Sequence, residues 1–424
     1  MPITDFPSVL QIKDPIHGYV GLSELEKKIL DLRLTQRLRN IRSPAGIHLV
    51  FPGADSSLMG RLLGVVHVSR VFVESLDGEM EEVEKTRLAS ILLTLSFGPW
   101  ANVMDEYLTA RGYNRKKMAT LIAEDTPVAD ILKNGSYSIS EIKDLITKGV
   151  PIKGIRTDLL TTPINPELVD NLERDAYFAG VEYAQLEFRR LFGATRIAKN
   201  KMAFERGALY TLESYLSAAA NMFDAVYYHK TIRAAELMLL RVMDEAGSRI
   251  IPFPSENLDD FMVSDDLTAH DILLSVSTDD SEGMKTAQRI FNDYRKRILI
   301  KQASARSVAD DAFLKKISTP DGLFSVEQEI ADDAAIDVKN IYVDYPDRPS
   351  VSYYPGKHSL DNLVLYERGS KGYEFWPVEE LSGVARSFGR KLKTVRVYTT
   401  RGYRSKVKKV ADTLLESIDT PGTS

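Results

Sequence analysis

One carboxylate stands at a position where an unpaired charge is costly. Asn165 and Pro166 favour the start of a helix, because asparagine caps a helix N-terminus and proline suits the first helical position. Further along that predicted helix, Leu168, Leu172 and Asp175 share one face at i, i+4 and i+7. A carboxylate on an apolar face must be paired or hydrogen-bonded. Asp175 is therefore a candidate site residue, and the alternative that it only accepts hydrogen bonds from nearby backbone groups stays open.

The histidines and cysteines limit the chemistry further. His17 in DPIHGYV and His229 in VYYHKT favour hydrogen-bonded structural roles over catalysis. The other histidines have no metal-ligand spacing, at positions 48, 67, 270 and 358. The absence of cysteine excludes disulfides, thiolate zinc sites and a cysteine nucleophile.

Residues 91–103, ILLTLSFGPWANV, contain no ionisable side chain. Leu88, Ile91, Leu92 and Leu95 form one stripe at helical spacing, so the first part of this segment is predicted to be the end of a core helix. The Gly-Pro pair that follows predicts a turn. This segment is therefore expected to contribute packing rather than chemistry.

A basic segment lies near the C-terminus. From Ser382 to Val410 the chain has ten Lys or Arg and no acidic residue, with aromatic residues between them. Such a segment could bind nucleic-acid phosphates or an acidic subunit face, although a solvated basic surface is the default. The cations expected to form this patch are Arg386, Arg390, Lys391, Lys393, Arg396, Arg401 and Arg404.

Hydrophobic periodicity predicts a mainly α protein. Residues 12–23 favour a short β element, helical patterns dominate to about residue 300, and one long helix is expected from Leu209 to about Glu245. Short aromatic and β-branched runs follow, including residues 351–354. The sequence therefore predicts a helical domain over 1–300 and a smaller C-terminal α+β subdomain over 301–424.

Composition sets few further limits. The 424 residues carry a formal net charge of −5, so a nucleic-acid or membrane partner would need a local patch. No apolar run approaches the length of a membrane span and no signal-peptide core is present. A cytoplasmic protein that does not bind membranes is expected.

Several motifs in order resemble the HD-domain phosphohydrolases, specifically the dGTPase-like branch with the SAM-and-HD-domain dNTP triphosphohydrolases. They are FPGADSSLMGRLLGVVHVS at 51–69, ILLTLSFGPWANVMDEY at 91–107 and NPELVDNLERDAYFAGV at 165–181, together with DPIHGYV, TQRLRNI and VYYHKT. The resemblance covers roughly residues 10–300. It implies an HD-type helical core.

The resemblance also implies a metal site whose ligand types have changed. Histidine and carboxylate ligands would stand at Arg61, Leu93, Thr94 and Asp175, of which only Asp175 can donate a lone pair in the family's manner. Further histidines of the family's GHGPFSH segment correspond to Phe97 and Asn102, so no general acid is expected there. We therefore expect no metal, no cofactor and no catalytic residue at this site. The guanidinium of Arg61 is predicted to pair with Asp175 in place of the metal.

The implied substrate and regulatory positions are also altered. A nucleotide-contacting glutamine corresponds to Ser43 and a phosphate-binding arginine to Ala219, while Tyr227 and Lys230 stay as a residual pocket. Three residues match a regulatory guanine-nucleotide site between subunits, although hydrogen bonds that tie the first helix to the core are the favoured explanation: Asp31, Gln36 and Arg39.

Three functions follow as hypotheses. The first is a pseudoenzyme that binds, regulates or scaffolds, as a homo-oligomer (dimer or tetramer) or with an active HD homologue. The second is a metal-dependent dGTP or dNTP phosphohydrolase with a non-standard site, for which Asp265-Asp266 and Asp279-Asp280 could bind a divalent ion. The third is a nucleic-acid binder that uses the basic C-terminal segment.

Overall fold

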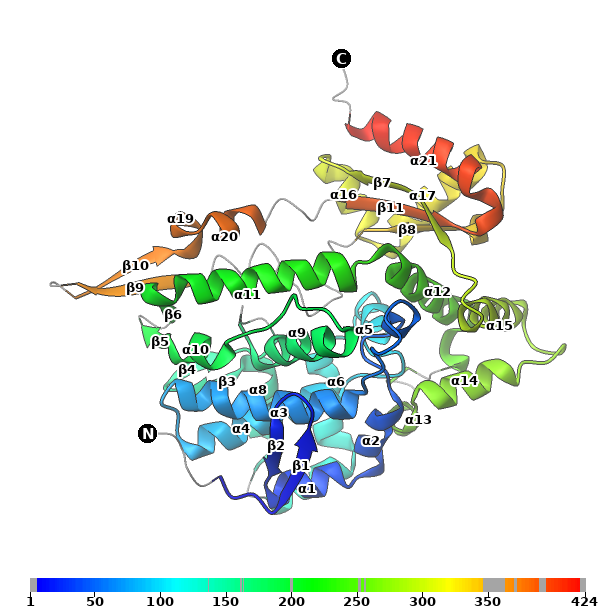
Figure 1. Ribbon diagram of the computed structural model, residues 1–424. Coiled ribbons are helices and arrows are strands. Elements are labelled where there is room, and N and C mark those ends of the chain that lie inside the picture. The colour runs from blue at the N-terminus through cyan, green and yellow to red at the C-terminus, as the bar shows by residue number, and fades with distance from the viewer. Residues whose placement is uncertain are drawn as a thin grey trace.

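The computed structural model describes residues 6–419, with gaps at residues 136, 161, 163, 199–200, 251–252, 255–256, 346–362, 370–371 and 389–393. Figure 1 shows a large helical body, with a smaller α+β unit above it that ends in the C-terminal helix. The mainly α fold predicted from the sequence is confirmed. None of the described helices is both long and apolar enough to cross a membrane.

The predicted N-terminal β element is a hairpin. Strands β1 (Leu10–Asp14) and β2 (Gly18–Leu22) pair antiparallel, and Gly18 adopts φ +77° where the turn ends. Glycine adopts this left-handed conformation without the steric cost that a Cβ adds. The turn presents Ile16 and His17 to the helical body.

The helical body is organised around α3 (Leu58–Ser75) and α4 (Met80–Leu95), which pack against each other. Most residues of α3, and those of α4 from Thr86 to Leu95, are buried, which explains the apolar stretches in both sequences. The body also contains α1 (Glu24–Leu30), α2 (Arg33–Gln36), α5 (Asn102–Thr109), α6 (Arg115–Asp125), α7 (Pro127–Asn134), α8 (Ile139–Lys148), α9 (Pro166–Ala179), α10 (Phe188–Gly193), α13 (Leu258–Val263), α14 (Asp266–Leu274), α15 (Glu282–Arg295) and the small hairpin β3 (Val150–Ile152) and β4 (Ile155–Thr157).

The single long helix predicted from Leu209 to Glu245 is wrong. The chain forms α11 (Leu209–Met222), a π-helical turn (Phe223–Tyr227) and α12 (Lys230–Ala246). His229 caps the second helix by accepting a hydrogen bond from the Thr231 backbone N–H, and the rings of Phe223 and Tyr228 stack at 4.1 Å across the break. A π turn changes which residues face the core, and such turns often occur at functional sites.

The C-terminal α+β unit has its own hydrophobic core. Its sheet is antiparallel in the order β7-β11-β8, and the helices pack on it (Figure 1). Its elements are β7 (Lys301–Ser307), α16 (Asp311–Ile317), α17 (Pro320–Asp333), β8 (Ile341–Asp344), β11 (Thr394–Thr399) and α21 (Arg404–Asp419).

Part of the chain after residue 300 packs on the helical body instead. Strand β9 (Val364–Gly369) pairs parallel with β6 (Lys201–Glu205), in a sheet of order β10-β9-β6-β5. Leu365 and Val378 accordingly belong to the main core. The other elements here are β5 (Thr195–Ala198), β10 (Gly372–Pro377), α19 (Val378–Leu381) and α20 (Gly383–Phe388). The strand expected at 351–354 lies outside the described residues.

Candidate functional site

A buried ion pair joins α3 to α9. Arg61 Nη2 lies 2.9 Å from Asp175 Oδ1 and 3.2 Å from Oδ2, and both side chains are 1% exposed. The Tyr227 hydroxyl, positioned by the π turn, donates to Asp175 Oδ2 at 2.8 Å. Arg61 also donates to the Ser43 carbonyl at 3.3 Å. The predicted pairing of Arg61 with Asp175 is confirmed.

The donors around Asp175 determine its charge state. Burial raises the pKa of the Asp175 carboxyl, and Arg61 and the Tyr227 hydroxyl oppose that rise. The guanidinium stays protonated at any relevant pH, so it places a fixed positive charge against the Asp175 carboxyl. Both carboxylate oxygens already accept hydrogen bonds. The site is therefore arranged as a closed structural contact.

Sequence reasoning missed a second buried pair beside the other altered positions. Arg115 Nη1 lies 2.7 Å from Glu167 Oε1, and Arg115 Nη2 donates to the Leu93 carbonyl at 2.7 Å. The guanidinium also lies 4.0 Å from the Phe97 ring centroid. Glu167 stands eight residues before Asp175 on α9, and no local spacing in the sequence links it to Arg115.

Thr94 and Asn102 are buried and hydrogen-bonded. Thr94 donates from its hydroxyl to the Ser90 carbonyl at 2.9 Å, within α4. Asn102 accepts from the Ala45 N–H at 2.8 Å and donates to Glu236 at 2.7 Å. The polar side chains of this region therefore bond to each other and to backbone groups.

The donor set does not fit a metal ion of the kind that the resemblance implies. Leu93 has no lone pair to donate, Arg61 carries a positive charge, and the Asp175 oxygens are engaged. Within the described ranges, no three His, Asp or Glu side chains form a metal-ligand group. Asp265 caps α14, and Asp280 pairs with an arginine at 2.8 Å.

Beside the ion pair the interior is nearly filled. A cavity of about 10 Å³ lies against Asn102, Tyr227 and Glu236. That volume holds about one water molecule, whereas ligand pockets usually measure several hundred Å³. A nucleotide cannot enter this cavity without a large rearrangement of the core.

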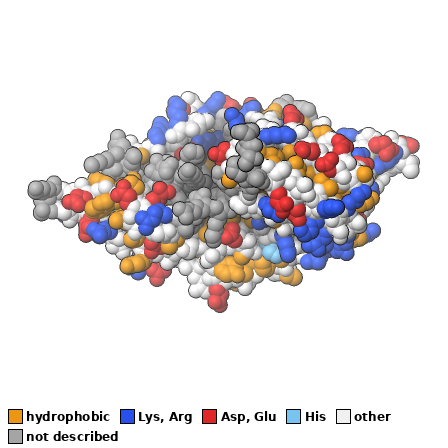
Figure 2. Space-filling view, turned by 90° about the horizontal axis from the view of Figure 1, so that it is seen from above, with side chains coloured by type: hydrophobic (Ala, Val, Ile, Leu, Met, Phe, Trp, Pro, Cys, Tyr) orange, Lys and Arg blue, Asp and Glu red, His pale blue; other side chains and the backbone are white. Residues whose placement is uncertain are grey.

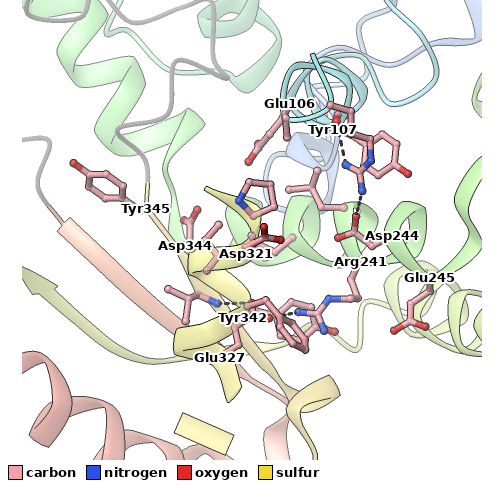
Figure 3. A pocket seen from close by; sticks show the side chains of 18 residues that line it. Glu106, Tyr107, Arg241, Asp244, Glu245, Asp321, Glu327, Tyr342, Asp344 and Tyr345 are labelled. Atoms are coloured by element: carbon pink, nitrogen blue, oxygen red, sulfur yellow. Dashed lines mark hydrogen bonds and ion pairs between the residues drawn. The ribbon is translucent and has the colours of Figure 1, made fainter. Parts of the chain in front are cut away.

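A charged cluster connects this region to the C-terminal unit. Arg233 on α12 lies 2.9 Å from Glu236, 3.0 Å from Glu106 and 2.8 Å from Asp344 of β8. Burial raises the pKa of Glu236 to about 7 although Arg233 opposes it. Glu106 and Asp344 also face a cavity of about 470 Å³ between α5, α12, α17 and β8 (Figure 3).

The other predicted residues lie elsewhere. Gln36 Nε2 donates to the Leu30 carbonyl at 2.7 Å, and Gln36 Oε1 accepts from Arg39 at 2.8 Å. These two hydrogen bonds connect α2 to the end of α1 and to the turn that follows α2. Asp31 is exposed, 3.8 Å from Lys27. Ala219 is buried in α11, and Lys230 is exposed at the start of α12.

The cations of the basic segment are distributed over several elements. Arg386 on α20 is exposed, as are Arg401 in the 3-10 turn before α21 and Arg404 at the start of α21. Arg396 on β11 is partly buried and donates to the Tyr228 carbonyl at 2.6 Å. Three members of the predicted patch lie outside the described residues: Arg390, Lys391 and Lys393.

The fold is that of a mainly α protein with small sheets, and comparison with known proteins assigns its family. Residues 186–423, more than half of the chain, match the family model described as the HD associated region. The chain belongs to this family and to the HD-domain phosphohydrolase superfamily, as its motifs predict. The retention of Gly98, Pro99 and the α9 face is consistent with that membership.

Its relatives include proteins with and without a stated activity. The chain is 28% identical over 245 residues to the uncharacterized protein YwfO of Bacillus subtilis, covering 55% of each chain. It is 24% identical over 322 residues to the deoxynucleoside triphosphate triphosphohydrolase SAMHD1 homolog of Dictyostelium discoideum, covering 71% of this chain and 61% of that protein. The matched segments therefore span only about half to three fifths of these relatives' lengths.

Two solved structures have the same fold. A hypothetical protein from Aquifex aeolicus superposes with a TM-score of 0.75 at 23% identity, covering 95% of this chain and 99% of that chain. A phosphohydrolase from Bacteroides thetaiotaomicron superposes with a TM-score of 0.69 at 18% identity, covering 92% and 100%. At these identities the likeness concerns the fold alone.

Proposed function

We propose that this chain is an HD-fold protein without metal-dependent hydrolysis, which acts as a binding, regulatory or scaffold protein. The observation that carries the proposal is the buried Arg61–Asp175 pair with Tyr227. A guanidinium at the centre of the family site supplies a fixed positive charge but has no exchangeable coordination position. A metal-bound water, which would be the nucleophile of a hydrolase, has no ligand set to form on.

The filled interior supports the same proposal. A substrate phosphate would have to approach Asp175 through the region that Asn102, Tyr227 and Glu236 now close. Opening that region would break the hydrogen bond between Asn102 and Glu236. The loss of two buried partners costs about 1–3 kcal/mol each, so substrate binding would have to offset that amount.

A chromatographic assay tests the proposal directly. Purified protein is incubated with each dNTP and Mg²⁺ or Mn²⁺, and deoxynucleoside and triphosphate are measured against a buffer control. No product is expected. Product that disappears in Asp175→Ala and Tyr227→Phe, but persists in the exposed control Asp271→Ala, would contradict the proposal and favour a hydrolase with a non-standard site. Tyr227→Phe removes only a hydroxyl, so it tests the site even if Asp175→Ala fails to fold.

A cluster of cations supports nucleic-acid binding as a second function. Burial and the positive charges of Arg401, Arg297, Arg404 and Lys230 lower the pKa of Lys301, so each of these four cations lies close enough to act on Lys301. The five cations come from the start of α12, the residues after α15, the start of β7, the 3-10 turn Arg401–Tyr403 and the first residue of α21. Figure 2, seen from the side of the C-terminal unit, also has Lys and Arg side chains gathered toward one end of that face. Phosphate groups are the natural counter-charge for such a surface.

Salt dependence tests this second function. Single-stranded DNA or RNA oligonucleotides are expected to bind with an affinity that falls steeply with salt. Arg401→Glu with Arg404→Glu is expected to weaken binding at least tenfold in fluorescence anisotropy. Lys27→Glu with Lys28→Glu on α1 makes the same change in net charge and is expected to leave affinity within about twofold. Equal losses of affinity in both double variants would mean that net charge, and not this cluster of cations, explains the binding.

A further inference from the structure

A cavity of about 620 Å³ lies on the side of α9 that the family site does not use. It is bounded by the β1–β2 turn, α3, α9 and the segment that leads into α10. Its walls combine the apolar side chains of Ile16, Val181 and Phe188 with the ionisable His67, Glu173 and Arg189, among others. This size and mixture are typical of small-molecule pockets.

His17, which lines this pocket, is held in place by a buried ionic network. Arg174 lies 3.0 Å from Asp14 and donates to both oxygens of Asp170 at 2.9 and 3.0 Å. His17 Nε2 lies 2.8 Å from Asp170 Oδ1, and Asp14 accepts from the His17 N–H at 2.9 Å. The side chains of these four residues are at most 2% exposed. The His17 side chain is therefore fixed in position on the pocket wall.

The network extends to the pocket rim through a second imidazole. His67 stacks on His17 with ring centroids 5.0 Å apart, and Arg189 Nη2 lies 3.3 Å from His67 Nε2. Burial, together with His17 and Arg189, lowers the pKa of His67 to about 4. His67 is therefore neutral and accepts the Arg189 N–H. This contact holds an exposed guanidinium on the lining of the pocket.

Glu173 provides the opposite charge. It lines the pocket, is partly buried, and has no hydrogen-bond or ion-pair partner within the part of the chain that the structure describes. Burial raises the pKa of the Glu173 carboxyl to about 7, although His17 opposes that rise. A partly buried carboxyl without a donor is destabilising, so a ligand that brings an N–H group would be favoured.

We propose that this pocket binds a small zwitterion, a free amino acid or a short peptide, whose ammonium group contacts Glu173 and whose carboxylate contacts Arg189. Guanidinium forks match carboxylates, and an ammonium group supplies the donor that Glu173 lacks. Within the described residues His17, His67 and Glu173 do not group as metal ligands. The proposal is independent of hydrolysis and of the basic cluster.

Thermal unfolding of the full chain tests it. The probes are the free amino acids and diglycine, each in large excess, because a ligand that binds only the folded state raises the unfolding temperature. At least one probe is expected to do so. Glu173→Gln and Arg189→Ala are each expected to weaken the binding of that probe at least tenfold. The neighbouring Arg190→Ala is the matched control, because Arg190 is exposed, pairs with Glu187 and does not line the pocket.

Proton release distinguishes direct contact with Glu173 from a distant effect. At pH 7 a carboxyl with a pKa of about 7 is half protonated, and a bound ammonium would favour its ionised form. Binding should therefore release up to about half a proton, measured by calorimetry in buffers of different ionisation enthalpy. The charged groups that act on Glu173 are His17, Asp170, Arg174 and Arg189. The release should vanish in Glu173→Gln. If no probe raises the unfolding temperature, if the three variants bind alike, or if no proton is released, the proposal is overturned.

Discussion

At the scale of single residues, Arg61 and Asp175 form a contact that stabilises the core only as a pair. A guanidinium buried alone, or a carboxylate buried alone, loses its hydration without compensation. Together, with Tyr227 and the Ser43 carbonyl, they satisfy most of each other's charge and hydrogen-bonding capacity. An ion pair at this position is therefore compatible with a stable core if both partners are kept.

Removing one partner of the pair should lower the free energy of unfolding much more than replacing both partners. Asp175→Ala and Arg61→Ala are each expected to lower the free energy of unfolding by about 3–5 kcal/mol, because each leaves an uncompensated buried charge. The double variant Arg61→Met with Asp175→Leu should recover most of that loss. Urea unfolding measures all three, with the exposed Asp271→Ala as control. A cost below about 1 kcal/mol for either single change would mean that water reaches the pair.

Asp170 should make the free energy of unfolding depend on pH in the acidic range. Burial opposes its ionisation, but Arg174 and His17 lower the pKa of its carboxyl to about 2. Since an unfolded aspartate has a higher pKa, near 3.8, the folded state binds fewer protons there. Its contribution is complete above about pH 4 and is lost as the pH falls toward 2. The difference in unfolding free energy between the wild type and Asp170→Asn should shrink over that interval. A constant difference from pH 6 to pH 2 would contradict this assignment.

At the scale of elements, caps, turns and periodicity predict the structure of a segment where that structure depends on the segment's own residues. The sequence correctly predicts the start of α9, with its Asn165 cap and Pro166, and the face that carries Asp175. It also correctly predicts the hairpin around Gly18. The break between α11 and α12 was missed because the periodicity of Leu212, Leu216 and Ala219 continues into the π turn. That turn is stabilised by tertiary contacts, the hydrogen bond from Tyr227 to Asp175 among them.

The same reasoning explains which site contacts sequence could predict. The pairing of Arg61 with Asp175 follows from the resemblance and from charge alone. Arg115 with Glu167, and Arg233 with Asp344, join segments 52 and 111 residues apart, and no local pattern links such partners. Charged side chains of this kind look like ordinary surface residues in the sequence. Their burial becomes apparent only when the helices are packed.

Arg233 is expected to control how firmly the C-terminal unit is attached. Arg233→Leu removes the cation shared by Glu106, Glu236 and Asp344, which leaves three carboxylates with reduced compensation. We expect a loss of about 3–5 kcal/mol in unfolding free energy and faster amide exchange in β8. Arg249→Leu, which breaks an exposed pair with Asp280, is the control and should change neither. Unchanged exchange in β8 would mean that apolar packing alone attaches the unit.

At the scale of the whole molecule, the scaffold role proposed above requires a surface for partners. Val263, Leu267 and Leu274 on α13 and α14 are 36%, 57% and 42% exposed. Leu267 and Leu274 stand seven residues apart, so they share one face of α14. Apolar side chains gathered on a surface are typical of protein contacts. This face is therefore the candidate for association with a second copy.

Self-association through that face is the last prediction. Light scattering after size-exclusion chromatography is expected to give the mass of a dimer or tetramer. Leu267→Lys with Leu274→Lys should shift it to the monomer, because each lysine would have to bury its charge in the contact. Tyr210→Lys on α11, where the tyrosine is 80% exposed, is the control and should keep the oligomer. A wild-type monomer at all concentrations would remove homo-oligomerisation from the proposal, leaving an active homologue as the partner to test. An oligomer that survives the double lysine variant would instead place the contact on another face.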